Sequence, residues 1–517
     1  MPDFIKKPTL LSAWVAVGLW VLAYGLLKVF SLDGLDIDGA EQVYFAQSWQ
    51  MGYGTRQPPL YTWLLLWLKP QQAAWAGVLE FSRYVCLLVW LAGVQALAKV
   101  CGADRSVQAR VILAHLGLLL VMWRVHDSLT HTVLAAGVSV WASVVLIKAL
   151  HKPAYWLLVG GLAAVACLSK LNAALWCVSS LLSAWIVILT MPSNRPSQEP
   201  AARDHLIWMS LGLMVFVVAI APYAHWWLTQ PSGSVALARR IVISDDHQPL
   251  WRPLTRVLAG SLEYLLLTPL LLFALTSRIR SNTGRTGAAA SIGSRWLLWQ
   301  TGVGLVILSL VLVAMKASHF TPRWLWPVVP GLTVWMCVRS FQSLDVQADG
   351  GSPAWRARAS VLVWCLVLVS IGMAAVRLSV PRANAQRCTN CWTDRPAQLM
   401  SSDLHARYGQ QALRIITGDD HLAGILSQVD ERDSTWTASS VDLPPPADFV
   451  HDRSPCVASW VSMDNPSELP DGLRHLVGDA WGAPVAQASW PMRLAAHRRI
   501  WLSSMALPVG VCDKARQ

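Results

Sequence analysis

Long, continuous apolar blocks dominate this sequence and restrict the folds that it can adopt. About eleven blocks occur, each close to the roughly 20 residues that a helix needs to cross a bilayer. Only 14% of the residues are charged, against about a quarter in an average soluble protein, and the mean hydropathy is +0.41. The blocks do not alternate apolar and polar residues, which disfavours a β-barrel. We predict an all-α, multi-pass membrane protein with spans at residues 9–30, 76–99, 107–123, 129–149, 154–169, 171–190, 206–228, 257–275, 295–315, 323–339 and 358–378.

The pair of blocks at 154–169 and 171–190 leaves two interpretations open, because only Lys170 and Asn172 interrupt it. The pair is either two spans or one broken helix. The positions of lysine and arginine support the count of eleven, since basic residues collect in cytoplasmic loops. With eleven spans, one face holds all the basic segments: Lys6 and Lys7, Arg195 and Arg203, Arg278 to Arg295, and Arg356 with Arg358. The net charge of +12 therefore reflects membrane orientation and does not indicate nucleic acid.

Residues 381–517 differ in character from the rest of the chain. Polar residues become frequent, and the run LRIITGDDHLAGIL predicts a strand, an acidic turn and a helix. We predict a membrane domain over 1–380 and a soluble α/β domain over 381–517, on the face opposite the basic loops. This second domain contains Cys388, Cys391, Cys456 and Cys512. In an oxidising compartment these suggest two disulfides, with three pairings open, although CTNC could instead be a redox or zinc half-site.

An acidic segment follows the first apolar block, in the predicted outer loop 31–75. Asp36, Asp38 and Glu41 stand just outside the membrane, where carboxylates are costly without a task. A short interfacial helix over 38–50 would place Asp38 and Glu41 on one face, because residues i and i+3 are neighbours. These residues are candidates for catalysis, with Asp36 in an auxiliary role. The alternative is that they cap a helix and carry solvated loop charges.

Two further outer segments carry candidate site residues. In RQPPLYTW, two prolines lead into an interfacial helix. There Arg56 could hold a phosphate, and Tyr61 could assist in acceptor binding or lie in the headgroup zone. In RVHDSLTH, Asp127 would lie at the depth of Asp38, beside His126. The alternatives are an N-cap role for Asp127 and a structural role for His126.

Several basic residues at the predicted outer face could bind a lipid phosphate. Lys170 stands between two apolar blocks, where a lysine either reaches water or meets an anion. The segment KASHFTPRWLWPVVPG adds Lys316, His319 and Arg323, which could bind a phosphate or simply border an aromatic belt. We predict a donor-phosphate site formed by Arg56, Lys170, His319 and Arg323.

These motifs, in this order, resemble the GT-C superfamily of integral-membrane glycosyltransferases. The sequence is most similar to bacterial glycosyltransferase family 39, the protein O-mannosyltransferase-like group that includes the lipid A aminoarabinose transferases. The resemblance covers the whole membrane region and extends into the C-terminal region. It rests on the acidic outer loop and on GYGTRQPPLYTW, HD, LSK, HFTPRWLWPVVP, CTNCW and TGDDHLAGIL.

The resemblance implies a hexosyl- or pentosyltransferase of the bacterial inner membrane with a periplasmic C-terminal domain. Such enzymes move a sugar from a polyprenyl-phosphate donor to a lipid, glycan or protein acceptor outside the cytoplasm. The family's catalytic Asp matches Asp38, whereas its following Glu is replaced by Gly39, and its Lys before the prolines by Gln57. The resemblance establishes no cofactor, and a divalent metal ion is one option.

Two other classes of function fit a multi-pass membrane protein. A transporter or flippase of a lipid-linked sugar would place charges within its spans and use paired broken helices. A membrane-anchored sensor would leave the acidic first loop without a role. Here the charges gather at one membrane face, which favours the enzyme.

Overall fold

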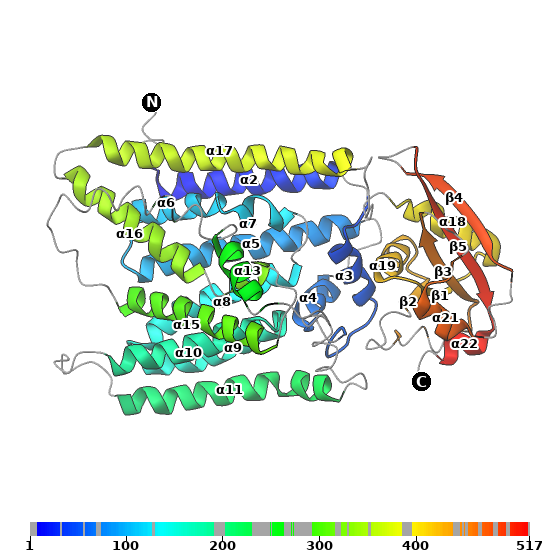
Figure 1. Cartoon of the computed structure of the whole chain (residues 1–517), viewed down its shortest axis with the longest axis horizontal. Coiled ribbons are helices and arrows are strands. Elements are labelled where there is room, and N and C mark those ends of the chain that lie inside the picture. The colour runs from blue at the N-terminus through cyan, green and yellow to red at the C-terminus, as the bar shows by residue number, and fades with distance from the viewer. Residues whose placement is uncertain are drawn as a thin grey trace.

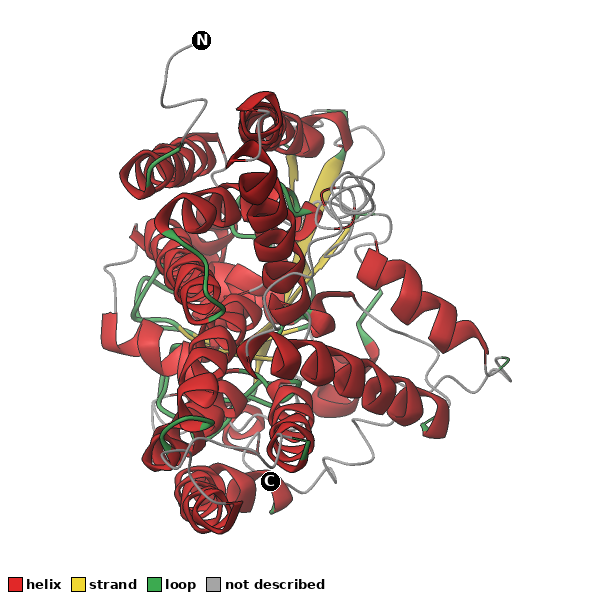
Figure 2. Cartoon of the chain, turned by 90° about the vertical axis from the view of Figure 1, so that its left-hand side faces the viewer, coloured by secondary structure: helices red, strands yellow, loops and turns green. Residues whose placement is uncertain are grey.

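A bundle of long helices, capped at one end by a small sheet, forms the molecule (Figure 1). The computed structural model describes residues 8–31, 34–54, 57–68, 74–126, 130–190, 202–229, 249, 251–262, 270, 272, 292–315, 322–327, 330–349, 353–384, 395–437, 445–446, 449, 453–463, 468–478, 484–492 and 497–514. Figure 2 looks along the bundle and shows the strands lying behind the helices. The sheet therefore stacks on one end of the bundle.

The helices of the bundle follow the apolar blocks of the sequence. They are α2 (Leu10–Ser31), α5 (Trp75–Val100), α6 (Arg105–Leu116), α7 (Leu119–Met122), α8 (Thr130–Ala149), α9 (Trp156–Ser169), α10 (Ala173–Leu189), α11 (Ala202–Leu228), α13 (Trp251–Ser261), α15 (Ile292–Ala314), α16 (Pro330–Asp349) and α17 (Pro353–Asn384), with short 3-10 turns η2 (Arg124–His126), η3 (Pro153–Tyr155) and η5 (Pro322–Leu325). Most of the predicted span 257–275 lies outside the described residues. Within the described residues, four helices are long and apolar enough to cross a membrane, or five with one bent pair. Eleven crossings stay a prediction.

The predicted span 107–123 coincides with a bent pair of helices, because the helix breaks at Gly117. There α6 ends, Leu118 takes an extended conformation, and the next helical segment bends away by 55°. A Cβ at Gly117 would lie 3.0 Å from the Cβ of Leu366 on α17, so close packing favours glycine at the break. The pair α9 and α10, by contrast, forms two separate helices joined by a turn at Lys170, which is extended.

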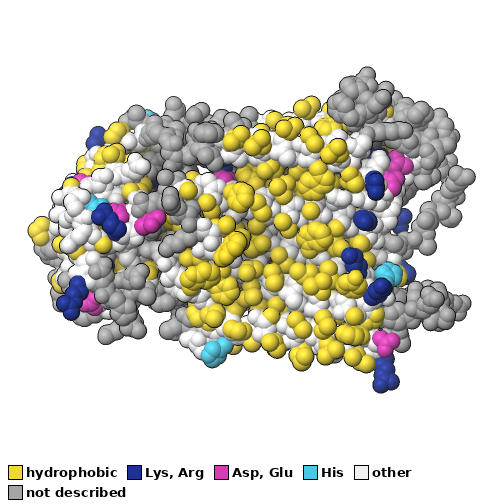
Figure 3. Space-filling model, turned by 180° about the vertical axis from the view of Figure 1, so that it is seen from behind, with side chains coloured by type: hydrophobic (Ala, Val, Ile, Leu, Met, Phe, Trp, Pro, Cys, Tyr) yellow, Lys and Arg dark blue, Asp and Glu magenta, His cyan; other side chains and the backbone are white. Residues whose placement is uncertain are grey.

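The outer surface of the bundle is apolar over its middle. Figure 3 shows hydrophobic side chains across one face and a row of basic side chains at the end opposite the C-terminal region. On α11, for example, Val217, Val218 and Leu228 are exposed. Apolar side chains without protein contacts on long helices suit a lipid environment, so the chain is a multi-pass membrane protein.

The C-terminal region is a five-stranded mixed sheet flanked by helices. Its elements are α18 (Ala397–Tyr408), β1 (Arg414–Thr417), α19 (Asp420–Val429), β2 (Ser434–Thr437), β3 (Cys456–Ser462), α21 (Asp471–Val477), β4 (Ala486–Pro491), β5 (Arg499–Leu507) and α22 (Val509–Lys514). The strand order is β2-β1-β3-β5-β4, with β1 parallel to both neighbours and the other pairs antiparallel. The predicted strand, turn and helix in LRIITGDDHLAGIL are confirmed as β1 and α19, with Asp419 capping the helix by accepting a hydrogen bond from the Leu422 amide.

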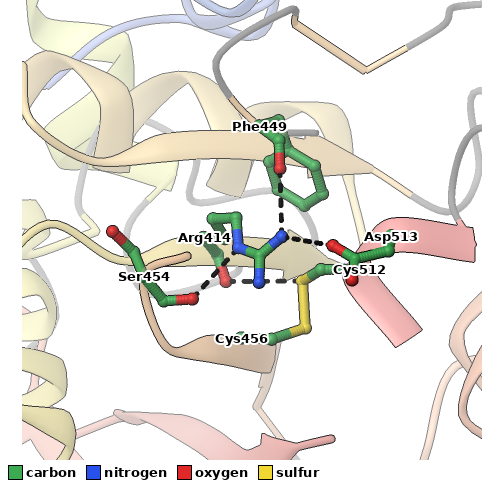
Figure 4. The surroundings of a disulfide bond; sticks show 6 residues. All are labelled: Arg414, Phe449, Ser454, Cys456, Cys512 and Asp513. Atoms are coloured by element: carbon green, nitrogen blue, oxygen red, sulfur yellow. Dashed lines mark hydrogen bonds and ion pairs between the residues drawn. A yellow bond between two sulfur atoms is a disulfide. The ribbon is translucent and has the colours of Figure 1, made fainter. Parts of the chain in front are cut away.

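A disulfide between Cys456 and Cys512 ties α22 to the start of β3 (Figure 4). Beside it, the buried guanidinium of Arg414 donates to the carbonyl oxygen of Ser454 and pairs with Asp513 at 2.8 Å. This is one of the bonds that the four cysteines allowed. Cys388 and Cys391, and with them the CTNC alternatives, lie outside the described residues.

Candidate functional site

A short helix, α3 (Ile37–Phe45), lies between the end of the bundle and the C-terminal region (Figure 1). It is shorter than the predicted 38–50, because the chain turns at Ala46 and Gln47. Asp36 caps it by accepting a hydrogen bond from the Gly39 amide at 2.6 Å. Asp38 and Glu41 then lie in its first two turns. They are three residues apart, so their side chains are neighbours on the same face of the helix.

Asp36 belongs to a four-residue ion cluster between α2, α3 and α5. Its carboxylate lies 3.5 Å from Lys28 Nζ and 3.4 Å from Arg83 Nη2, and both cations also contact Glu80 at 2.6 Å. Burial alone would raise the pKa of Asp36, but Lys28, Arg83 and the Gly39 amide outweigh it and hold the pKa below its usual value. Asp36 therefore stays ionised, and these contacts suit the capping alternative rather than an auxiliary catalytic role.

Asp38 faces two of the predicted cations. Its Oδ2 lies 3.8 Å from Arg323 Nη1, and both side chains remain partly exposed, at 26% and 35%. Lys170, half-buried in the turn between α9 and α10, responds to the same charges. Its pKa falls to about 8 because burial disfavours the charged amine and Arg323 repels it, while Asp38 and Glu41 partly restore it. Asp38 and Arg323 are thus adjacent, and Lys170 lies near enough to both, and to Glu41, for their charges to shift its pKa.

The segment after α3 positions Glu41. The Nε2 of Gln57 donates to a carboxylate oxygen of Glu41 at 3.3 Å. Gln57 itself is fixed by a tight turn, since its carbonyl oxygen accepts a hydrogen bond from the Tyr53 amide. This turn contains Gly54 at φ +67°, a conformation that favours glycine. Gly54 of GYGTRQPP therefore serves the geometry of the acidic site.

The prolines of the same motif lead into α4 (Leu60–Leu68), which braces α3. Thr62 donates a hydrogen bond to the side chain of Gln42 at 3.0 Å. Tyr61 is buried, with its hydroxyl 2.8 Å from Ser82 Oγ and its ring against His131. These are the contacts of a packed core side chain. Tyr61 therefore has a structural role here and not the predicted role in acceptor binding.

His126 is also buried, within an aromatic group of the bundle. Its ring stacks on Tyr24 with centroids 3.8 Å apart, and its Nδ1 lies 2.9 Å from the hydroxyl of Tyr84. This matches the structural alternative stated for it above. Four other predicted residues, Arg56, Asp127, Lys316 and His319, lie outside the described residues.

The sequence reasoning missed two residues that hold the basic side of the site. The Nδ2 of Asn172 donates to the carbonyl oxygen of Trp324 at 3.2 Å and so ties the Lys170 turn to the segment carrying Arg323. His131 Nδ1 lies 3.2 Å from the carbonyl oxygen of Ser169, the residue before Lys170. Asn172 follows Lys170 by two residues in LSKLN. This polar residue beside the lysine, between two apolar blocks, could have indicated its role from the sequence.

Among the described residues, one group meets the geometry of a metal site, and it lies in the C-terminal region. His405 Nε2 is 3.0 Å from Asp433 and 3.4 Å from Asp430. Arg432 also pairs with Asp430. This group does not include Asp38 or Glu41, and the predicted option of a metal beside them gains no support from it.

The fold has a counterpart among solved structures. The crystal structure of ArnT from Cupriavidus metallidurans in the apo state superimposes with a TM-score of 0.50 and 14% identity, over 95% of this chain and 97% of that one. ArnT is a GT-C membrane glycosyltransferase. The present chain therefore shares the overall fold of this ArnT structure over nearly its whole length.

Sequence comparison makes the relationship more specific, although no protein-family model matches the chain. The lipopolysaccharide core galacturonosyltransferase RgtA of Rhizobium johnstonii is 26% identical over 77% of this chain and 79% of its own length. RgtB of the same organism, a lipopolysaccharide core galacturonosyltransferase too, is 26% identical over 91% of both chains. The present chain is a membrane glycosyltransferase, and its resemblance to the GT-C superfamily is confirmed.

Proposed function

We propose that the chain transfers a sugar from a polyprenyl-phosphate donor to an envelope glycolipid at the outer, periplasmic face of the bacterial inner membrane. The observation that carries this proposal is the position of Asp38 and Glu41 opposite Lys170 and Arg323. An acid–base group thus faces an anion-binding group at one end of the helical bundle. Because the relatives act on the lipopolysaccharide core, a core glycolipid is the first acceptor to test, and galacturonic acid the first sugar.

Asp38 is the general base in this proposal. The acceptor hydroxyl attacks the anomeric carbon of the sugar while Asp38 takes its proton, and the bond between that carbon and the phosphate oxygen breaks. A general base must lie within hydrogen-bond reach of the proton that it takes. A single attack from the face opposite the phosphate inverts the anomeric configuration.

Lys170 and Arg323 stabilise the leaving group. The polyprenyl phosphate departs with the electron pair of the broken bond, and fixed cations beside it lower the free energy of the charge that develops. Before the donor binds, Arg323 pairs with Asp38. An incoming phosphate competes for Arg323 and leaves Asp38 free to accept a proton. Glu41, held by Gln57, orients the acceptor.

Transport of a lipid-linked sugar, the alternative left by the sequence, is not proposed. The described charges of this site belong to α3, to the turn at Lys170 and to η5. All of these are short segments at a helix end. A transport path would instead place such charges along the spans.

The proposal is tested with purified protein, a polyprenyl-phosphate galacturonic acid donor and a lipopolysaccharide core acceptor. We expect release of polyprenyl phosphate together with a glycosylated product of inverted anomeric configuration. Asp38→Asn should lower turnover by about 10²–10⁴-fold, because loss of a general base has effects of that size. Asp471→Asn is the matched control, since Asp471 also lies in the first turn of a helix and is exposed.

Normal turnover by Asp38→Asn would place the base elsewhere. If the wild-type protein turns over no polyprenyl-phosphate sugar, the proposal that its donor belongs to this class is wrong. Thermal stability is measured for each variant, so that unfolding is not mistaken for lost chemistry.

A further inference from the structure

Helix α19 of the C-terminal region contacts the backbone of α3 directly. A Cβ atom built at Gly424 would lie only 1.9 Å from the carbonyl oxygen of Ala40, far inside any contact that real Cβ atoms make. The absence of a side chain at Gly424 therefore allows the two helices to approach this closely. Both residues are buried, in the middle of their helices.

The same region holds the chain on both sides of α3. Before the helix, His421 Nε2 donates to the carbonyl oxygen of Leu35 at 3.0 Å. After it, the side-chain amide of Gln47 makes two hydrogen bonds to Thr435: it accepts from the amide at 3.0 Å and donates to the carbonyl at 3.1 Å. Thr435 lies on β2, one of the two edge strands of the sheet. Helix α3 is thus fixed at its start, middle and end by one structural unit.

The geometry of a helix then determines where the acidic side chains point. Successive residues turn by about 100°, so Asp38 lies roughly opposite Ala40 around the helix axis. The face bearing Ala40 rests on α19, and Asp38 on the other side meets Arg323 of the membrane bundle. A displacement of α19 would therefore shift Asp38 relative to Lys170 and Arg323.

We propose that the contact of α19 and β2 with α3 positions the catalytic carboxylate, with Gly424 and Gln47 as positioning residues that never touch the substrate. The inference rests on the proposed function. It assigns the C-terminal region a part in the transfer step itself. The cations of the donor site lie on other elements, at the α9–α10 turn and η5, so their hold on the donor phosphate does not depend on this contact.

Gly424→Ala tests the proposal, with Gly510→Ala as the matched control. A Cβ at Gly510, on α22 of the same region, meets no atom within 4 Å. We expect Gly424→Ala to lower kcat by about 10- to 100-fold, because a misplacement of about 1 Å can cost that much. The KM for the polyprenyl-phosphate donor should stay within about twofold of wild type. Gly510→Ala should match wild type in both constants. Equal kcat values for the two variants would overturn the proposal, and so would an equal loss of kcat and donor affinity in Gly424→Ala.

Gln47→Ala provides a second variant that adds no atom. It removes the two hydrogen bonds to Thr435 together with the one that Gln47 Nε2 donates to the carbonyl oxygen of Tyr44 at 2.9 Å. It should lower kcat in the same direction, and Gln47→Glu, which keeps only the acceptor, should fall between it and wild type. Amide hydrogen exchange in α3 gives a readout that needs no turnover: exchange should rise in Gly424→Ala and Gln47→Ala and stay unchanged in Gly510→Ala. Unchanged exchange in all three would refute the contact. If the wild-type protein shows no turnover but amide hydrogen exchange in α3 changes among the variants as expected, only the proposed function is refuted.

Discussion

The ionisation of Lys170 links one side chain to a measurable pH profile. Its pKa of about 8 means that the donor-free protein loses this cation as the pH rises from about 7 to 9. Phosphate binding needs the charged form, so kcat/KM for the donor should fall by up to about tenfold per pH unit above 8. Lys170→Arg should remove this alkaline limb, because arginine stays protonated throughout that range. The measurement is kcat/KM against pH for both proteins.

The control for this experiment is Lys148→Arg, on the basic last turn of α8. It should keep the wild-type profile. An alkaline limb that persists in Lys170→Arg would assign the titration to another group and would separate Lys170 from the donor phosphate.

Individual site residues could be predicted from the sequence where charge and membrane position acted together. Asp38, Glu41, Lys170 and Arg323 were each selected because a charged residue beside an apolar block is costly, and the structure brings them together. This argument applies equally to Asp36 and Asp38, so it could not show that their roles differ. Its partners Lys28, Glu80 and Arg83 are spread over two other helices, and only the tertiary fold shows that it is a cap in an ion cluster.

At the scale of elements, apolar block length located most of the described helices, although the span predicted at 323–339 is found at α16 (Pro330–Asp349), and breaks within helices were harder to foresee. The bend at Gly117 depends on the close approach of Leu366, nearly 250 residues later in the sequence. The end of α3 at Phe45 has a similar cause. The chain after it turns toward β2, where Gln47 bonds to Thr435. Local propensity carries no information about either partner.

The Cys456–Cys512 disulfide is the element-scale feature most open to measurement. It closes a 56-residue separation between β3 and α22. Removing a native disulfide from a small domain typically costs about 2–5 kcal/mol, so Cys456→Ala with Cys512→Ala should lower the thermal midpoint of the C-terminal region. Cys365→Ala is the control, because Cys365 is a free, exposed thiol. The midpoints are measured by thermal denaturation of the full chain in detergent.

Thiol labelling complements that measurement. In the wild-type protein, Cys456 and Cys512 should react with a maleimide only after reduction and unfolding, whereas the free Cys365 should react after unfolding without reduction. Labelling of Cys456 in unreduced, unfolded protein would rule out the bond.

For the whole molecule, the distribution of charge predicts which side of the membrane each end of the bundle faces. Basic side chains gather at the end away from the C-terminal sheet (Figure 3), and such residues favour the cytoplasm. An alkaline phosphatase fused after Gln517 should therefore be active, and a fluorescent protein fused there should be dark. Fusions within 191–200, the predicted cytoplasmic loop after α10, should give the opposite pattern. A fluorescent C-terminal fusion would reverse the orientation and place the site on the cytoplasmic face.

The ion cluster of Lys28, Asp36, Glu80 and Arg83 has a consequence for how this protein can evolve. The four side chains carry two positive and two negative charges, so the group is neutral as a whole. Loss of one member leaves an uncompensated charge away from water, which typically costs about 3–5 kcal/mol, whereas joint replacement by apolar residues can be nearly neutral. Descendants of this sequence should therefore change these positions in oppositely charged pairs. Substitutions at four positions, on α2, on α5 and at the N-cap of α3, would then be correlated with one another.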